Sequence, residues 1–310
     1  MRNKQRRLVT EMLQDIYGQV DFLPTPLLTK LGPLLARAQQ EMEKELRDWL
    51  ATENGAARFT AQRLRIGLIR TRRAMERIKK SINPEIMRGL RIGSGTAGQL
   101  ATRNIERELI KFGEIFGEMI SPAQLDTAAL IAKGDKLLVN KFAASTARYS
   151  ESIRGEIASQ LALSKIRNET VAEATLRLQK TIPQVFRHAR SRAETIVRTE
   201  LMNAYNYHHE LGIKELRNHD PDIRMRWDAY RDRRTCLQCA SLDGQVIDVS
   251  NSRAVYKSSW ESSAGKSYKA THERPPAHPC CRCVAVAWRK DWDADITREP
   301  MREKTQRRAA

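Results

Sequence analysis

The chain has 310 residues, of which 41% are hydrophobic and 6% aromatic, and its 55 Lys and Arg outnumber its 37 Asp and Glu, giving a net charge of +18. This length fits one large or two modest domains, and the scarcity of aromatic residues favours packed helices over a β-sandwich. A pI near 10.0 predicts attraction to a polyanion such as nucleic acid, although a helical protein with solvated basic faces would have the same balance.

The first residues are basic and then amphipathic, without the apolar stretch and cleavage site of a secretory signal. No apolar run comes near the roughly 20 residues that a membrane span needs. We therefore expect no membrane contact and synthesis in a cytoplasm, where clustered cysteines bind metals more often than they form disulfides.

The N-terminal part predicts two helices broken near Pro24 and Pro26, followed by a stop and turn at 53–55. Residues 56–80 then carry nine basic residues against Glu76 alone. This bias indicates contact with DNA phosphates or with an acidic partner, the alternative being a solvated face. The residues predicted to bind nucleic acid are Arg63, Arg65, Arg70, Arg72, Arg73, Arg77, Lys79 and Lys80.

The middle of the chain is predicted to remain helical with several interruptions. The three glycines of residues 90–101 predict a loop that leads into a helix, without the Gly-Lys-Ser/Thr that a nucleotide-binding loop requires. Ser121 and Pro122 are expected to cap and start the next helix, which is followed by a long helical stretch. Asn168 or Thr170 is predicted to cap a short helix, and an unbroken helix is expected after Pro183.

The pattern changes after residue 219. Residues 222–230 alternate and predict a strand, an Asp-Gly turn at 243–244 feeds a second strand, and residues 284–290 form a third. The Ser-rich residues between the second and third strands are expected to form a loop. The predicted fold class is therefore α+β, with a mostly α-helical N-terminal region followed by a small β-containing, zinc-knuckle-like C-terminal module.

All five cysteines lie in two short strings, and this confinement predicts a metal site. Cys236 and Cys239 form a C-x-x-C, whose two sulfurs can reach one tetrahedral ion from a single turn. The second string keeps the same spacing twice, between His278 and Cys281 and between Cys280 and Cys283. Either pair would complete four ligands with Cys236 and Cys239, so we predict a structural zinc ion at this site. Free thiols, an extracellular disulfide and a redox-active C-x-x-C are the weaker alternatives.

These strings belong to a larger pattern that resembles the phage Mu protein F-like family of minor head, or head morphogenesis, proteins. The resemblance covers roughly residues 160–290 and rests on elements in a fixed order. They are Arg198-Thr199-Glu200, Trp227, Asp232, Arg234-Thr235-Cys236, Cys239, Leu242-Asp243-Gly244, His278-Pro279 and Cys281-Arg282-Cys283. The family's last motif reads His-Pro-x-Cys-Arg-Cys, which favours His278, Cys281 and Cys283 as ligands over Cys280.

The resemblance implies a low-copy protein inside the head of a tailed bacteriophage, near the portal protein and the packaged double-stranded DNA. It implies action in head assembly and, in some members, DNA delivery, with location in the virion and in the host cytoplasm during assembly. The expected organisation is a helical region at 1–159 that faces portal or DNA, a Mu F-like domain at 160–290 with its Cys/His module at 222–290, and a mobile charged tail at 291–310.

The helix before the module carries four polar residues near one another, namely Arg198, Glu200, Asn203 and Asn206. We expect them to pair within the helix, and the alternative is that they buttress the cysteine module or contact the portal. Adjacent residues on a helix point about 100° apart, so His208 and His209 cannot easily share one ion and are expected to be surface or packing residues.

An enzyme is the less favoured interpretation. A zinc-dependent nuclease needs an open coordination position and a nearby carboxylate, for which Asp232, Asp243 and Glu273 are candidates by sequence position. A Cys-rich ligand set instead indicates a closed site, so we expect no catalysis and no small-molecule substrate. A basic, zinc-stapled DNA-binding protein unrelated to phage heads is a further alternative.

Overall fold

The computed structural model describes residues 2–117, 125–251, 253–290 and 292. Contacts divide the chain into two compact units, each built from segments far apart in the sequence. Unit 1 comprises residues 1–24, 92–138 and 198–310, and unit 2 comprises residues 25–91 and 139–197. Because these units are defined by contacts in space, the contiguous segments 1–159, 160–290 and 291–310 stay predictions about the sequence.

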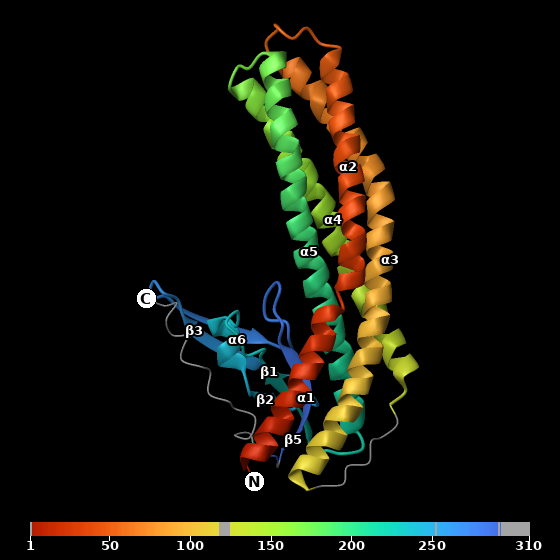
Figure 1. The fold of residues 1–310 in the computed structure, drawn as a ribbon, viewed down its shortest axis with the longest axis vertical. Helices are drawn as coiled ribbons and strands as arrows, with labels where there is room; N and C mark the ends of the chain where they lie inside the picture. The colour runs from red at the N-terminus through yellow and green to blue at the C-terminus, as the bar shows by residue number, and fades with distance from the viewer. Residues whose placement is uncertain (1, 118–124, 252, 291, 293–310) are drawn as a thin grey trace. The chain divides into compact units, whose positions relative to one another are not determined.

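Long helices form most of the chain, and a small antiparallel β region follows them, which confirms the predicted fold class (Figure 1). The expected break near Pro24 is present, and buried residues of the second helix recur at three- and four-residue steps. The helices are α1 Arg2–Phe22, α2 Thr25–Ala51, α3 Ala61–Phe116, α4 Thr127–Ile166 and α5 Val171–Arg217. None of the described helices has the length and apolar character needed to cross a membrane.

Unit 2 is a bundle of segments from α2, α3, α4 and α5, which Figure 1 shows as long helices running side by side. Small residues let these helices approach closely. A Cβ on Gly67 of α3 would lie 2.6 Å from the Trp49 ring of α2 and 3.4 Å from Leu161 of α4. Ion pairs join α3 to α4, through Lys79 and Glu151, and α4 to α5, through Glu156 and Arg192.

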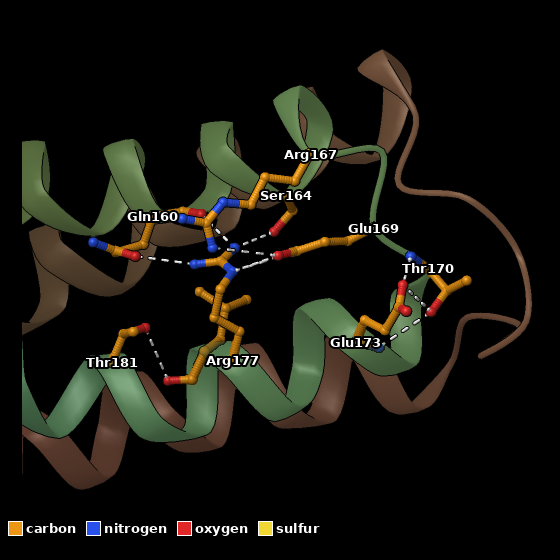
Figure 2. A network of polar contacts seen from close by, with 9 residues as sticks. Gln160, Ser164, Arg167, Glu169, Thr170, Glu173, Arg177 and Thr181 are labelled. Carbon is orange, nitrogen blue, oxygen red and sulfur yellow. Dashed lines mark hydrogen bonds and ion pairs between the residues drawn. The ribbon is translucent and has the colours of Figure 1, made fainter.

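The turn between α4 and α5 is fastened by one arginine (Figure 2). The Arg177 guanidinium donates to Glu169 at 2.9 Å, to the side chain of Gln160 at 2.9 Å and to Ser164. Thr170 caps α5, because its hydroxyl accepts the Glu173 N–H at 3.2 Å while the Glu173 carboxylate accepts the Thr170 N–H at 2.7 Å. Of the two predicted caps, Thr170 is therefore the one that is formed.

The predicted loop at 90–101 was wrong, because these residues lie inside α3. Two of the three glycines, Gly93 and Gly98, serve helix packing. A Cβ on Gly93 would lie 2.6 Å from Leu201 of α5, and one on Gly98 would lie 2.6 Å from Ile131 of α4. Large residues on the facing helices fill the space that the missing side chains leave, so the contacts offset the low helix propensity of glycine.

One further helix boundary differs from expectation, and another lies outside the described residues. Pro183 lies within α5 and does not separate two helices, since Ile182, Val185 and Phe186 around it are buried and packing outweighs the lost backbone bond. Ser121 and Pro122 lie outside the described residues; the described α4 begins after Asp126, whose carboxylate accepts the Ala129 N–H at 2.9 Å. The predicted tail at 291–310 also lies outside the described residues, except for Trp292.

A three-stranded antiparallel sheet in unit 1 has the order β2-β1-β5, from β1 Ile223–Asp228, β2 Val246–Ile247 and β5 Val284–Arg289. All three predicted strands are thus confirmed. In the register of β1 and β5, Met225 lies opposite Ala287. Both faces of β5 are covered: Phe112 of α3 lies 5.3 Å from the Trp288 ring, and Trp227 of β1 lies 5.1 Å from the Tyr256 ring.

The Ser-rich stretch predicted to be a loop instead forms a second sheet, the hairpin of β3 Tyr256–Glu261 and β4 Ser267–His272. Its polar strands lack the apolar alternation that marks a half-buried strand, and Tyr256 anchors it by donating to the Met225 carbonyl at 2.9 Å. A short helix that the sequence did not predict, α6 Leu237–Leu242, packs against β3 and contains the second cysteine of the C-x-x-C.

Candidate metal centre

The first two donors are placed by the start of α6. Cys236 is the N-cap of this helix, and its sulfur accepts the Cys239 N–H at 3.4 Å. Cys239 follows on the first turn and is buried. A sulfur that accepts a backbone N–H three residues ahead is held in a fixed position, so a single tight turn points both sulfurs to the same side.

The other donors come from the segment that leads into β5. The Cys281 N–H donates to the His278 carbonyl at 3.1 Å, which closes a turn. Cys281 and Cys283 are both buried just before the strand begins at Val284. Cys280 is exposed and has a positive φ of 56°, and its backbone N–H donates to the Thr199 hydroxyl of α5 at 3.0 Å.

The structure brings all five predicted metal ligands together in two overlapping triads that share Cys239. His278 Nε2 lies 3.2 Å from Cys236 Sγ and 3.1 Å from Cys239 Sγ. On the other side, Cys239 Sγ lies 3.7 Å from Cys281 Sγ, and Cys283 completes that triad. Cys280 belongs to neither triad, so the geometry removes the ambiguity that the fifth thiol introduced.

This donor set fits a soft tetrahedral cation. Two sulfurs bound at about 2.3 Å to a tetrahedral ion lie about 3.8 Å apart, close to the 3.7 Å between Cys239 and Cys281. The residues are buried or half-buried and are all free of disulfides. Thiolate and imidazole ligands of this kind bind zinc, whereas carboxylate and carbonyl oxygens would be needed for magnesium or calcium.

The sulfurs and the imidazole of the cluster shift one another's pKa values. Hydrogen bonds with Cys239 and then His278 lower the pKa of Cys236 to about 4, and the bond with Cys236 raises the pKa of His278 to about 9. Contacts with Cys236, Cys281 and Cys283 raise the pKa of Cys239 instead. Neighbouring sulfurs therefore cannot all ionise without a cation, and a bound metal would replace the retained protons.

Helix α5 supports this cluster through hydrogen bonds from Asn206 to the backbone around Cys283. The Asn206 amide nitrogen donates to the Cys283 carbonyl at 3.2 Å, and its oxygen accepts the Ala285 N–H at 2.7 Å. The amide nitrogen also donates to the Met202 carbonyl within the helix at 3.0 Å. The Asn206 amide thus does both things that were considered for the polar residues of this helix: it bonds within the helix, and it supports the cysteine module.

The carboxylates near the cluster are engaged by arginines. Asp232 lies 2.6 Å from Arg282 and 3.2 Å from Arg234; burial raises its pKa, but these hydrogen bonds outweigh burial and lower it to about 2. Asp243 lies 2.8 Å from Arg231 and also accepts the Ala229 N–H. Both carboxylates are therefore held in ion pairs, and neither belongs to the two triads.

The cluster, its supporting helix and the three-stranded sheet are matched by one family model, described as Phage Mu protein F like protein, over residues 156–286. This region of the chain is phage Mu protein F-like. The match suggests a phage head-morphogenesis protein, because the proteins of this family are structural head proteins. No curated protein and no solved structure gave a significant match to the chain.

The phage Mu protein F-like region contains every donor of the two triads and all of α5, and it starts after α1, α2 and α3. His208 and His209 of α5 are both buried, so they are packing residues and not surface residues. His208 lies 3.4 Å from the Ser94 hydroxyl and 3.8 Å from Asp135, and His209 lies 3.1 Å from the buried Glu108 carboxylate. Each faces a different partner, as their 100° separation predicted.

Glu108 was missed by the sequence analysis although it organises the sheet. Its carboxylate accepts the Ala287 N–H of β5 at 2.7 Å as well as bonding His209, and it is fully buried. The signal was available: Glu108 stands between the buried Ile105 and Phe112 on the apolar face of α3. An acidic residue within an apolar stripe is informative because it must find a buried partner.

The eight basic residues predicted to bind nucleic acid lie outside the phage Mu protein F-like region, on α3 in unit 2. The structure divides them into two sets of four. The paired set is bound to acidic residues of the bundle and comprises Arg63, Arg70, Arg77 and Lys79. The free set is exposed, forms no ion pair with the described part of the chain, and comprises Arg65, Arg72, Arg73 and Lys80.

Proposed function

We propose that the chain is a structural protein of the phage head that acts during head assembly, joins the head through the portal protein and has no catalytic turnover. The observation that carries this proposal is the family match over residues 156–286, which spans the five-donor cluster and the helix that supports it. Thr199 of the motif on that helix accepts the Cys280 N–H, and Asn206 of the same helix donates to the Cys283 carbonyl. These bonds support a structural role for this part of the helix.

Within this module we propose a structural zinc ion bound by Cys236, Cys239 and Cys281, with His278 or Cys283 as the fourth ligand. The overlapping triads and the 3.7 Å separation of two sulfurs support this assignment. The metal would hold together a region whose second strand has only two residues and whose hairpin is largely polar. In so small a module, metal-binding energy becomes folding energy.

The absence of catalysis is part of the proposal. A zinc ion with four protein ligands has no position left for substrate or activated water. The nearby carboxylates of Asp232 and Asp243 are held by Arg282 and Arg231. Glu273, the third candidate base, is 79% exposed and belongs to neither triad. No small-molecule substrate is therefore proposed.

We further propose that the chain tolerates or contacts packaged double-stranded DNA without sequence preference, inside the virion near the portal and in the host cytoplasm during assembly. The charge distribution supports this. Unit 2 carries 25 Lys and Arg against 12 Asp and Glu, so it holds +13 of the net +18. A charge surplus of this size attracts a polyanion at long range, and the eight basic residues predicted from the sequence contribute to it.

The test combines assembly with chemistry. The purified chain is mixed with the portal protein and assayed for a complex, and purified virions are examined for the chain by mass spectrometry. We expect a complex and presence in virions. In parallel, the chain is incubated with DNA and Mg²⁺, Mn²⁺ or Zn²⁺, and we expect no cleavage. Absence from virions together with no portal complex would leave a basic, metal-binding DNA-binding protein, and cleavage lost in Asp232→Asn would establish a nuclease.

A further inference from the structure

One side of α3 in unit 2 faces solvent over about four turns and combines basic with aliphatic residues. Two of its aliphatic side chains, Leu68 and Ile69, are 37% and 44% exposed. They lie between basic residues at three- and four-residue steps, so all these side chains share one face. We call this the α3 outer face, and it comprises Arg65, Leu68, Ile69, Arg72, Arg73, Glu76 and Lys80.

The charges of this face are available to a partner. The paired set on the same helix already forms ion pairs within unit 2. Arg77, for example, lies 2.9 Å from Glu41 and 2.8 Å from Glu45 on α2. The four basic residues of the outer face form no ion pair with the described part of the chain. Glu76 is the only acidic residue among 61–81, and it lies 3.4 Å from Lys79.

The aliphatic pair distinguishes between two kinds of partner. DNA phosphates offer nothing against which Leu68 and Ile69 would pack, so a surface built only for DNA would not place them between the arginines. An amphipathic helix offers an apolar ridge that can bury both side chains. The basic residues also suit such a helix, because Arg65, Arg72 and Lys80 follow one another at seven- and eight-residue steps, about two turns or 11 Å each.

We propose that the α3 outer face docks an acidic amphipathic helix of another protein of the assembling head. The partner's carboxylates lie opposite Arg65, Arg72, Arg73 and Lys80, and its apolar ridge packs on Leu68 and Ile69. This inference rests on the proposed function only for the location of the partner. The face itself is argued from charge complementarity and from the exposed aliphatic pair.

The decisive experiment uses the full chain and a synthetic helical peptide that carries glutamates at seven-residue steps beside a leucine ridge. A second peptide has the same charge with serines in place of the leucines, and a DNA duplex is the third probe. We expect the leucine peptide to bind at least about tenfold more tightly than the serine peptide. The double variant Leu68→Ser, Ile69→Ser should lose this preference. The matched variant Ile166→Ser, Leu176→Ser, which changes two other exposed aliphatic residues of unit 2, should keep it.

Equal binding of both peptides, or a preference that survives in Leu68→Ser, Ile69→Ser, overturns the proposal. Binding of the duplex alone would make the face a nucleic-acid surface and would overturn it as well. A photo-crosslinking residue at position 69 in assembling heads then identifies the occupant, with position 176 as the control. A crosslink to an acidic amphipathic segment of another protein supports the proposal; a crosslink to DNA or to a second copy of this chain contradicts it. Absence of the wild-type chain from heads counts against the proposed function alone, since the peptide measurements stand without it.

Discussion

Asn206 of α5 encloses the peptide units around Cys283: its amide nitrogen donates to the Cys283 carbonyl at 3.2 Å, and its oxygen accepts the Ala285 N–H at 2.7 Å. Asn206, Cys283 and Ala285 are all buried, so bulk water cannot replace either hydrogen bond. The bonds fix the last cysteine relative to a helix of the same unit. The segment that carries Cys283 is thus attached to α5 by a side chain that belongs to neither triad.

We expect Asn206→Ala to lower the free energy of unfolding by about 2–4 kcal/mol, because it leaves a buried carbonyl and a buried N–H without partners. Urea denaturation followed by far-UV circular dichroism measures this. Asn218→Ala, at an exposed position just after α5, is the control and should change stability by less than about 0.5 kcal/mol. Equal effects of the two substitutions would show that the bonds to the cysteine segment contribute nothing.

We expect about one zinc ion per chain in fresh, reduced protein, and chelation should unfold the C-terminal module while most helical signal remains. The fluorescence of Trp227, which is fully buried next to Tyr256, reports on the module, and far-UV circular dichroism reports on the helices. Metal below about 0.2 per chain in fully folded, reduced protein would contradict the structural zinc.

Single cysteine substitutions separate ligands from bystanders. Cys239→Ser should abolish metal binding, since Cys239 is common to both triads. Cys280→Ser should bind zinc like the wild type, since Cys280 is exposed and belongs to neither triad. His278→Ala and Cys283→Ala, compared by metal titration, decide the fourth ligand: the ligand's loss should weaken binding at least about tenfold more than the other's. Loss of metal from Cys280→Ser would refute the geometric assignment.

Glycines in the helices of unit 1 should respond to substitution according to what faces them. A Cβ on Gly134 would lie 2.2 Å from Cε1 of the buried His208, so Gly134→Ala should cost about 2–3 kcal/mol of stability. Gly95 has nothing within 4 Å of such a Cβ, and Gly95→Ala should stabilise by about 0.5–1 kcal/mol through helix propensity. Thermal unfolding of the two variants checks both signs.

The sequence could predict the helices, three strands and the clustering of cysteines with His278, because each leaves a local pattern. The spacing of Cys236 and Cys239 alone predicts a knuckle. The apolar residues that recur at three- and four-residue steps in α2 predict its buried face. Interactions between distant residues leave no such pattern. The glycines of 90–101 resembled a loop, because Leu201 and Ile131, which fill the space beside them, stand on other helices.

The hairpin was missed for a related reason. Its strands are held at one edge by a side chain, since the Gln245 amide donates to the Lys257 carbonyl at 2.8 Å and accepts the Lys257 N–H at 3.0 Å. The sequence of the two strands has no apolar alternation from which this contact could be predicted. The division of the basic residues was equally hidden, because the partner of Arg77 is Glu41, 36 positions earlier in the sequence and on a different helix. Composition gives the charge, and only the fold shows which charges are already paired.

The surplus of charge in unit 2 gives the last prediction. We expect the full chain to bind two duplexes of different sequence equally, with log affinity falling by about 0.9 for each phosphate contact per unit of log salt. Because long-range attraction depends on total charge, two triple variants that each remove three exposed basic residues of unit 2 should weaken binding and flatten this slope alike. One is Arg65→Gln, Arg72→Gln, Arg73→Gln on α3, and the other is Arg148→Gln, Lys180→Gln, Arg187→Gln on α4 and α5. Fluorescence anisotropy across a salt series measures both. A loss confined to the α3 variant would instead make that helix the DNA-binding element, and no binding at low salt would remove DNA from the list of partners.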